Sequence, residues 1–195
     1  NLYDSETNLW RYKVWNNLGI NIITLNYITQ EGSKQIASSE KMYQSALMAY
    51  NYLVTKGSVP YDHILVYGEG LGTYPASKLA KEMQIAGLIL ENGITSMQKF
   101  LKDLYPILAV GYLVEEQFHV EQYVKEIEVP SLFIYLEKDD TYPTQHTKQL
   151  FEKAGSREKK LISLKDKSKA LKNKNIKTYQ KALSDFLKEL KLRVI

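Results

Sequence analysis

Short apolar runs alternate along the chain with longer segments whose apolar residues recur at helical spacing. The runs are rich in aliphatic and β-branched residues, the pattern of strands buried on both faces of a sheet. We expect strands at 20–27, 63–67, 86–92, 131–137 and 159–164. Helical spacing predicts helices at 5–18, 38–55, 73–84, 143–154 and 175–192. This alternation predicts an α/β fold with a mostly parallel sheet flanked by helices.

Turn and capping residues support several of these boundaries. Ser38 or Ser39 can cap the second helix, and Gly19 can stop the first. Pro143 suits the first turn of the helix that it opens. No repeat, Pro-rich linker or Gly/Ser-rich tract divides the chain, so we expect residues 1–195 to form a single domain.

A glycine-rich turn follows the strand expected at 63–67. A phosphate-binding loop would need Lys and then Ser or Thr after Gly72, and neither is there. A dinucleotide fingerprint would need glycine at the position of Thr73. The string Gly68-Glu69-Gly70-Leu71-Gly72 instead has the spacing of the nucleophile elbow G-x-S-x-G, with Gly70 at the position of the nucleophile.

Several strings around this turn, in this order, resemble one superfamily across essentially the whole chain. They are Ser39-Glu40, VYGEGLGTYPASKLA (66–80), LILENGITS (88–96) and LEKDDTYP (136–143). The chain resembles the α/β-hydrolase superfamily, in the serine-hydrolase branch that includes bud-emergence-type and depalmitoylase-like proteins. That fold has further strands before the first helix found here, so the resemblance implies an N-terminally incomplete domain. It also implies a small helical, lid-like insertion at about 95–127, with breaks around Pro106 and Gly111.

The resemblance implies a degenerate catalytic triad. Gly70 stands at the nucleophile position, and Asp139, with Asp140 beside it, stands at the position of the acid. The histidine of the family belongs to the loop 165–175, which here contains none. The backbone N–H of Leu71 would be one oxyanion donor, and the other would lie at or before residue 1.

Loss of the nucleophile and the general base predicts that this chain is not a working serine hydrolase. Removing either group typically lowers the rate by about 10⁴–10⁶-fold, and the losses do not add. The lysines of the loop 165–175 are poor substitutes, because an exposed lysine has a pKa of about 10.4. We therefore expect no catalytic residues.

Other side chains offer weak alternatives for chemistry. Glu69 is interpreted as a surface carboxylate, Ser77 as a helix-surface or packing residue, and Asp139 and Asp140 as ordinary turn residues. The three histidines show no metal-ligand spacing and are interpreted as structural; they are His63, His119 and His146. With no cysteine in the chain, no thiol nucleophile or Cys-based zinc site exists, and we expect no cofactor or metal.

Charge and aromatic content bear on partners. The net charge is +4, but residues 157–195 hold 13 Lys+Arg against 4 Asp+Glu, so the C-terminal end is basic. No recognised nucleic-acid motif accompanies it, which makes a nucleic acid an improbable partner. The 15 tyrosines and 2 tryptophans are a composition that suits protein interfaces. No apolar stretch is long enough to span a bilayer. The compartment is undetermined, with an intracellular one favoured.

Three functions remain open. The first is a catalytically inactive structural or accessory subunit of a larger assembly, contacting other protein subunits through the basic 157–193 region. The second is a protein that binds a small molecule or acyl chain in the former substrate cleft. The third is a hydrolase with relocated catalytic groups, which would turn over simple esters and react with a serine-directed phosphonate.

Overall fold

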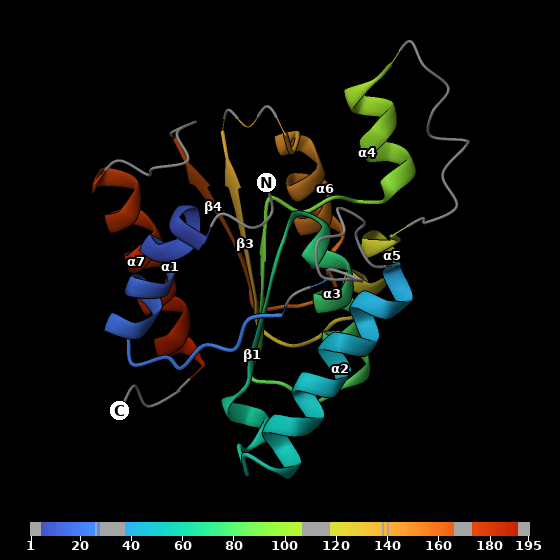
Figure 1. The fold of residues 1–195 in the computed structure, drawn as a ribbon. Coiled ribbons are helices and arrows are strands. Elements are labelled where there is room, and N and C mark those ends of the chain that lie inside the picture. Colours follow the sequence, from blue (N-terminus) through green and yellow to red (C-terminus); the bar gives the residue numbers. More distant parts are fainter. Residues whose placement is uncertain are drawn as a thin grey trace.

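A parallel sheet of four strands forms the centre of the computed structural model, which describes residues 5–25, 27, 38–106, 118–137, 139, 141–165 and 173–190. The strands lie in the order β1-β2-β3-β4, and every neighbouring pair is parallel. Their bounds are β1 Leu65–Glu69, β2 Gly87–Glu91, β3 Ser131–Leu136 and β4 Lys159–Leu164. Sequence order therefore equals spatial order in this sheet (Figure 1).

Helices cover both faces of the sheet (Figure 1). α1 (Ser5–Asn17) and α7 (Asn173–Glu189) pack on one face, where Trp15, Tyr179 and Phe186 share a core with Ile89 of β2. The other face carries α2 (Ser39–Thr55), α3 (Thr73–Glu82), α5 (Val120–Val124) and α6 (Thr144–Lys153). Two short 3-10 turns, Tyr61–His63 and Gly70–Gly72, precede and follow β1.

The central strand β2 shows why the sequence forms this sheet. All five of its residues are buried, because both of its faces are covered. Leu88 and Leu90 contribute to the core beneath α2 and α3, whereas Ile89 contributes to the core beneath α1 and α7. A continuous apolar run is therefore the expected sequence for a strand in this position.

Four of the five expected strands are confirmed, and the expectation for 20–27 is wrong. Residues 20–25 and Tyr27 form no strand, and Asn26 lies outside the described residues. An apolar run becomes a strand only when a neighbour completes its hydrogen-bond ladder. In the described part of the chain the sheet ends at β1, and no strand lies between β1 and this run. Ile23 consequently remains 53% exposed.

The described residues of the region 95–127 include two helices. α4 (Met97–Leu104) ends before Pro106, and α5 follows after residues 107–117, which contain Gly111 and lie outside the described residues. Ser38 caps α2 by accepting a hydrogen bond from the Lys41 N–H. Pro143 is the N-cap of α6 rather than its first-turn residue. None of the described helices combines the length and apolar character needed to cross a membrane.

Candidate functional site

The glycine-rich turn has the strand–turn–helix geometry that its spacing predicts. β1 ends at Glu69, the turn Gly70–Gly72 follows at once, and α3 begins at Thr73. Gly70 has φ +56°, a left-handed conformation that residues with a side chain rarely adopt. A side chain at Gly68 would collide with the backbone oxygen of Gly72, 2.5 Å from the position of its Cβ. The turn is therefore built for close backbone packing.

The phenol ring of Tyr142 lies against Gly70. A Cβ atom at Gly70 would stand 2.5 Å from both Cζ and Oη of Tyr142, closer than real Cβ contacts allow. Burial raises the pKa of the Tyr142 hydroxyl, and the nearby carboxylates of Glu69 and Asp139 raise it further. A backbone hydrogen bond from Leu71 acts in the opposite direction, as a donated N–H would. The N–H of Leu71 thus faces a tyrosine hydroxyl.

Asp139 holds the loop that carries Tyr142. Its Oδ1 accepts hydrogen bonds from the backbone N–H of Thr141 at 2.7 Å and of Tyr142 at 2.9 Å, an Asx-type turn. Phe100 of α4 stacks on the Tyr142 ring, with centroids 5.6 Å apart. Asp139 therefore orders a loop in this structure, while its neighbour Asp140 lies outside the described residues.

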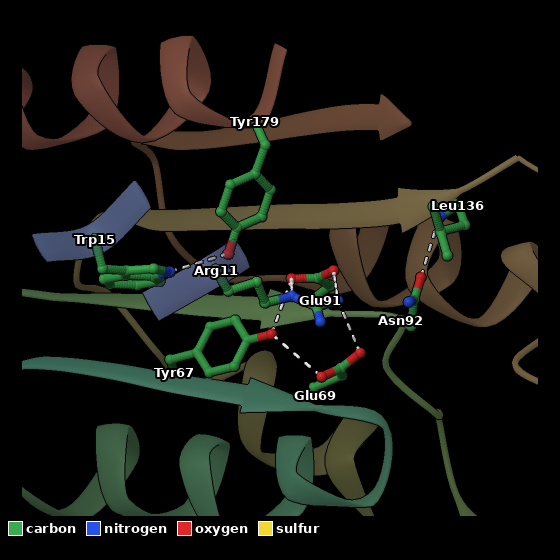
Figure 2. Close-up of polar contacts among 8 residues, drawn as sticks. All are labelled: Arg11, Trp15, Tyr67, Glu69, Glu91, Asn92, Leu136 and Tyr179. Atoms are coloured by element: carbon green, nitrogen blue, oxygen red, sulfur yellow. Dashed lines mark hydrogen bonds and ion pairs between the residues drawn. The ribbon is translucent and has the colours of Figure 1, made fainter. Parts of the chain in front are cut away.

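A buried ionic cluster lies beside the turn, at the carboxyl ends of β1 and β2 (Figure 2). Arg11 of α1 places Nη2 2.5 Å from Glu91 Oε1 and 3.0 Å from Glu69 Oε1. The Tyr67 hydroxyl donates to Glu91 Oε2 at 2.9 Å. The Glu91 side chain is 1% exposed. Glu69, interpreted as a surface carboxylate, is partly buried: its side chain is 35% exposed and forms an ion pair with Arg11.

The pKa values of Glu69 and Arg11 are both raised in this cluster, but for different reasons. Burial raises the pKa of Glu69 to about 7, because desolvation and the neighbouring Glu91 outweigh the attraction of Arg11. Burial alone would lower the pKa of the Arg11 guanidinium, but Glu91, Tyr67 and Glu69 more than offset it and raise that pKa. Arg11 is thus held as a cation between the two strands, and its hydrogen bonds fix α1 to the sheet.

Two further hydrogen bonds lie near this cluster (Figure 2). The Trp15 indole N–H donates to the Tyr179 hydroxyl at 3.3 Å, which joins α1 to α7. Asn92, in a left-handed conformation with φ +48°, follows β2 directly and accepts a hydrogen bond from the Leu136 N–H at 3.0 Å. These contacts pair buried polar groups, as a folded core requires.

The structure brings together one acid–imidazole–hydroxyl set that the sequence did not indicate. His146 Nδ1 lies 2.8 Å from the Thr95 hydroxyl, and His146 Nε2 lies 3.2 Å from Asp103 Oδ2. Burial lowers the pKa of His146, while Asp103 opposes this shift. Thr95 is 0% exposed, so its hydroxyl is closed to a substrate. Thr95 and His146 are 51 positions apart, so no local motif could have indicated the set.

The other candidate residues from the sequence, Ser77, His63 and His119, lie in a buried helix position, on the surface and at a helix N-cap. Ser77 is fully buried in α3, and among the described residues its hydroxyl has no hydrogen-bond partner. His63 is exposed and lies 2.9 Å from Asp62, and His119 is the N-cap of α5. In the described ranges, no group of three or more His, Asp or Glu side chains is arranged to hold a metal ion.

An apolar groove of about 660 Å³ runs along the outer edge of β1. Residues 18–25 and Trp15 of α1 line one side of it, and Met42, Tyr50 and Leu53 of α2 line the other. Leu65, Tyr67 and Glu69 of β1 contribute to its lining. The groove lies where the expected strand at 20–27 and β1 fail to meet.

Relatives of known sequence carry α/β-hydrolase domains. The chain is 26% identical to the alpha/beta hydrolase domain-containing protein WAV2 of Arabidopsis thaliana, over 72% of this chain and 50% of that protein. It is 24% identical to the alpha/beta hydrolase domain-containing protein 17B of Xenopus laevis, over 70% of this chain and 46% of that protein. The chain thus spans about half the length of the curated relatives it matches.

Solved structures share the fold. An alpha-beta hydrolase from Vibrio vulnificus superposes with a TM-score of 0.72 at 21% identity, covering 93% of this chain and 69% of that one. The esterase domain of a Rhodothermus marinus protein gives a TM-score of 0.70 at 13% identity, covering 96% of this chain and 81% of that one. No protein-family model matches the chain. The strand–turn–helix geometry, the parallel sheet and these superpositions show that the chain has the α/β-hydrolase fold, and its listed relatives are similar in sequence and named as α/β-hydrolase domain-containing proteins.

Proposed function

We propose that this α/β-hydrolase-fold protein is catalytically inactive and acts as a structural or accessory subunit of a larger protein assembly. The single observation that carries the first half is the position of the Tyr142 ring against Gly70. A serine hydrolase needs a nucleophilic oxygen at this turn and free space for the carbonyl that it attacks. Here glycine supplies no oxygen, and the phenol fills the space.

The surroundings of Tyr142 add to this argument. The backbone N–H of Leu71, the expected oxyanion donor, faces the tyrosine hydroxyl instead of an empty site. Asp139, at the position of the family's acid, uses its carboxylate to order the loop of Tyr142. The loop 165–175 contains no histidine to act as a base. The oxyanion donor and the acid therefore interact with Tyr142 or its loop, and the expected loop contains no histidine.

The strongest candidate for relocated catalysis is the set Asp103, His146 and Thr95. Its order of groups suits the activation of a hydroxyl, since an imidazole next to a carboxylate can remove a proton. The hydroxyl of Thr95 is, however, completely buried, and His146 is 1% exposed. This burial favours a packing role for the set and weakens the hypothesis of a relocated hydrolase.

The subunit role rests on the surface. Among the residues that the structure describes, three tyrosines are at least half exposed, namely Tyr52, Tyr61 and Tyr105. Exposed aromatic rings are enriched at the centres of protein interfaces. The described part of the basic C-terminal region contributes lysines on β4 and α7, and some of them pair with acids of α7, as Lys181 does with Asp185. The exposed tyrosines therefore support a protein partner more strongly than the lysines of β4 and α7 do.

An acyl-chain or small-molecule carrier is the second candidate. The space above Gly70 is filled by Tyr142 and Phe100, so a ligand would not occupy the former nucleophile site. The apolar groove beside β1 is the observation that keeps this candidate open. A ligand of this class would be detected as a stoichiometric small molecule released from the purified protein on denaturation.

Ester turnover tests the inactive state directly. We expect the chain to hydrolyse no p-nitrophenyl ester above the level of a heat-denatured sample, and to show no labelling by a fluorophosphonate. Turnover that disappears in Thr95→Val would overturn the proposal in favour of the relocated set. Native size-exclusion of the endogenous protein tests the subunit role, and migration as a free species would contradict it.

Gly70→Ser restores the nucleophile oxygen and should still give no activity. The new Cβ would overlap the Tyr142 ring in a left-handed backbone, so we expect a destabilisation of about 1–3 kcal/mol. Gly72→Ser is the matched control, because nothing lies within 4 Å of the position its Cβ would take and its φ is −63°. We expect it to change the free energy of unfolding by less than about 0.5 kcal/mol. Urea titrations of the three proteins measure both effects.

A further inference from the structure

His146 is a buried titratable side chain that the proposed function does not use. It lies on α6 and is 1% exposed. Its Nδ1 accepts a hydrogen bond from the backbone N–H of Thr95 at 3.3 Å, and the Thr95 hydroxyl lies 2.8 Å from the same nitrogen. A ring nitrogen that accepts from an N–H carries no proton of its own. These contacts therefore assign the proton of the neutral imidazole to Nε2.

The carboxylate nearest to Nε2 gives a positive charge on this imidazole only partial support. Asp103 Oδ2 lies 3.2 Å from Nε2, but within the described residues Nε2 has no aligned hydrogen-bond partner. The same oxygen accepts a hydrogen bond from the Gln145 side chain at 3.1 Å, and the Asp103 side chain is 38% exposed. Gln145 and water thus share the carboxylate with the imidazole, which weakens its attraction to a charged ring.

Three parts of the α4 segment meet this imidazole. Thr95 comes just before Ser96, the N-cap of α4, and Asp103 lies in the last turn of the helix. Between them, the Phe100 ring packs edge-on against the imidazole, with centroids 6.0 Å apart. Phe100 also stacks on the ring of Tyr142. Through one side chain, α6 therefore contacts the start, the middle and the end of the α4 segment.

The helix α4 has few other anchors. It lies at the outside of the fold (Figure 1). Of its eight residues only Phe100 is buried, and three other apolar side chains are partly buried. Lys99 pairs with Glu121 of α5 at 2.8 Å, but the Lys99 side chain is 51% exposed, and exposed pairs contribute little. An element with so few buried contacts opens at a small cost in free energy.

Protonation of the imidazole would disturb its contact with Thr95. A second proton must go to Nδ1, because Nε2 already carries one. The Thr95 N–H would then face another donor, and only the hydroxyl could turn to accept from the charged ring. Thr95 is 0% exposed, so water does not reach the N–H that loses its acceptor. A buried donor without a partner is unfavourable, and displacement of the Thr95 segment relieves it.

We propose that His146 is a pH-sensitive switch for α4: a proton taken from water at Nδ1 releases residues 95–104 from α6 and uncovers the Tyr142 ring beside Gly70. The observation that carries this step is the hydrogen bond from the Thr95 N–H to Nδ1, which only the neutral imidazole can accept. Both the closed and the open α4 are compatible with an inactive protein, so the switch goes beyond the proposed function.

The charges around the imidazole set the direction of the pH dependence. On α4, Asp103 favours the protonated form and Lys99 opposes it. On α5, Glu121 is paired with Lys99 and with Lys153 of α6. Tyr142 is neutral, because its pKa is raised. Burial has the largest influence and lowers the pKa of the imidazole, so the closed state is fully favoured above the ordinary histidine pKa of about 6.5 and is weakened as the pH falls.

Hydrogen exchange followed by mass spectrometry tests where the proton acts. Opening that takes up one proton becomes up to about tenfold more favourable per pH unit below about pH 6.5. After correction for the intrinsic exchange rate, we expect the protection of residues 95–104 to fall about fivefold between pH 6.5 and 5.5. Residues 87–91 of β2 should stay more strongly protected at both pH values. No fall at 95–104, or equal protection of the two segments, overturns the proposal.

Two histidine variants locate the proton. His146→Asn places an amide oxygen near the position of Nδ1, so it keeps an acceptor for the Thr95 N–H but does not titrate in this range. We expect the protection of residues 95–104 in this variant to change less than about twofold between the two pH values. His63→Asn is the matched control, because His63 is 56% exposed and lies on neither α4 nor α6, and it should keep the full fall. A fall that persists in His146→Asn, or that disappears in both variants, contradicts the proposal.

Nitrogen NMR of the wild-type imidazole tests the assignment without any variant. At pH 7.5 we expect Nε2 of His146 to be protonated and Nδ1 to be unprotonated, with Nδ1 gaining a proton as the pH falls. A proton on Nδ1 at pH 7.5 would overturn the proposal. These measurements are separate from ester turnover and native mass, so the switch can fail while the proposed function stands, and the reverse.

Discussion

Arg11 and Glu121 are each the centre of an ion-pair cluster that ties a helix to distant parts of the chain. Arg11 is one cation between two carboxylates, Glu69 and Glu91, and its side chain is 10% exposed. Glu121 is one carboxylate among three lysines, and its side chain is 18% exposed. Arg11 fixes α1 to β1 and β2, whereas Glu121 of α5 reaches Lys99 of α4 and Lys153 of α6.

The two clusters differ in what controls the protonation of the carboxylate. Hydrogen bonds from Lys153 and Lys99 lower the pKa of Glu121 to about 2, because the attraction outweighs burial there. At Glu69 burial has the stronger influence, and it raises the pKa to about 7 despite the nearby Arg11. The same ion-pair chemistry therefore stabilises the charged carboxylate in one place and the protonated carboxylate in the other. Desolvation, rather than the presence of a partner, decides the direction.

The largest effect is expected from Arg11→Met. The variant leaves Glu91 as a buried carboxylate whose remaining side-chain hydrogen bond, within the described residues, comes from the Tyr67 hydroxyl. Breaking a buried ion pair on one side costs about 3–5 kcal/mol. We expect a loss of this size in the free energy of unfolding, measured by urea titration at pH 7. A loss below about 1 kcal/mol would show that the cluster is solvated like a surface pair.

The double variant Arg11→Met with Glu91→Leu sharpens this test. It removes the buried charge together with its partner, and apolar replacement of a whole buried pair is often close to neutral. We therefore expect the double variant to be more stable than Arg11→Met alone. Lysine at position 11 is a further control, because it keeps the charge but not the geometry that contacts two carboxylates.

A smaller effect is expected from Glu121→Gln. The folded-state pKa of Glu121 lies below the unfolded value, so its contribution is present above about pH 4.5 and is lost as the pH falls toward 2. The lysine partners are about half exposed, and we expect the variant to lose about 1 kcal/mol at pH 7. The difference from the wild type should vanish near pH 2. A constant difference across this range would contradict the assignment.

The smallest effect is expected from Glu69→Gln, and its pH dependence has the opposite sign. The folded-state pKa of Glu69 lies above the unfolded value, so its contribution is complete below about pH 4.5 and is lost as the pH rises through about 7. Because the side chain is 35% exposed, solvent reduces the effect to less than about 1 kcal/mol. Thermal unfolding from pH 4.5 to 7.5 measures whether stability falls less with rising pH in the variant than in the wild type. The same fall in both proteins would contradict the assignment.

Much of the fold could be predicted from local pattern. The runs at 86–92 and 131–137 became strands because each is buried by helices on both faces, which is the condition that an apolar run encodes. The run at 20–27 has the same composition, yet its described residues form no strand. Strand formation depends on a neighbour, and the presence of a neighbour is not a property of the run itself.

The candidate site was predictable only in part. The spacing of the glycines located the turn, and the φ of +56° at Gly70 follows from that motif. The Tyr142 ring against Gly70 was not predictable, because 72 positions of sequence separate the two residues. The same is true of Arg11 and Glu91, which are 80 positions apart. Sequence spacing identifies elements, and only packing identifies their contacts.

The sequence by itself determined the α/β class, the parallel strands and the glycine turn, because hydrophobic period and backbone freedom are local properties of the chain. The tertiary structure decided which groups meet there: a tyrosine against Gly70, a buried guanidinium between two carboxylates, and, within the described residues, an unpaired edge on β1. Each of these depends on desolvation and on contacts between distant residues, and both arise only when the helices close over the sheet.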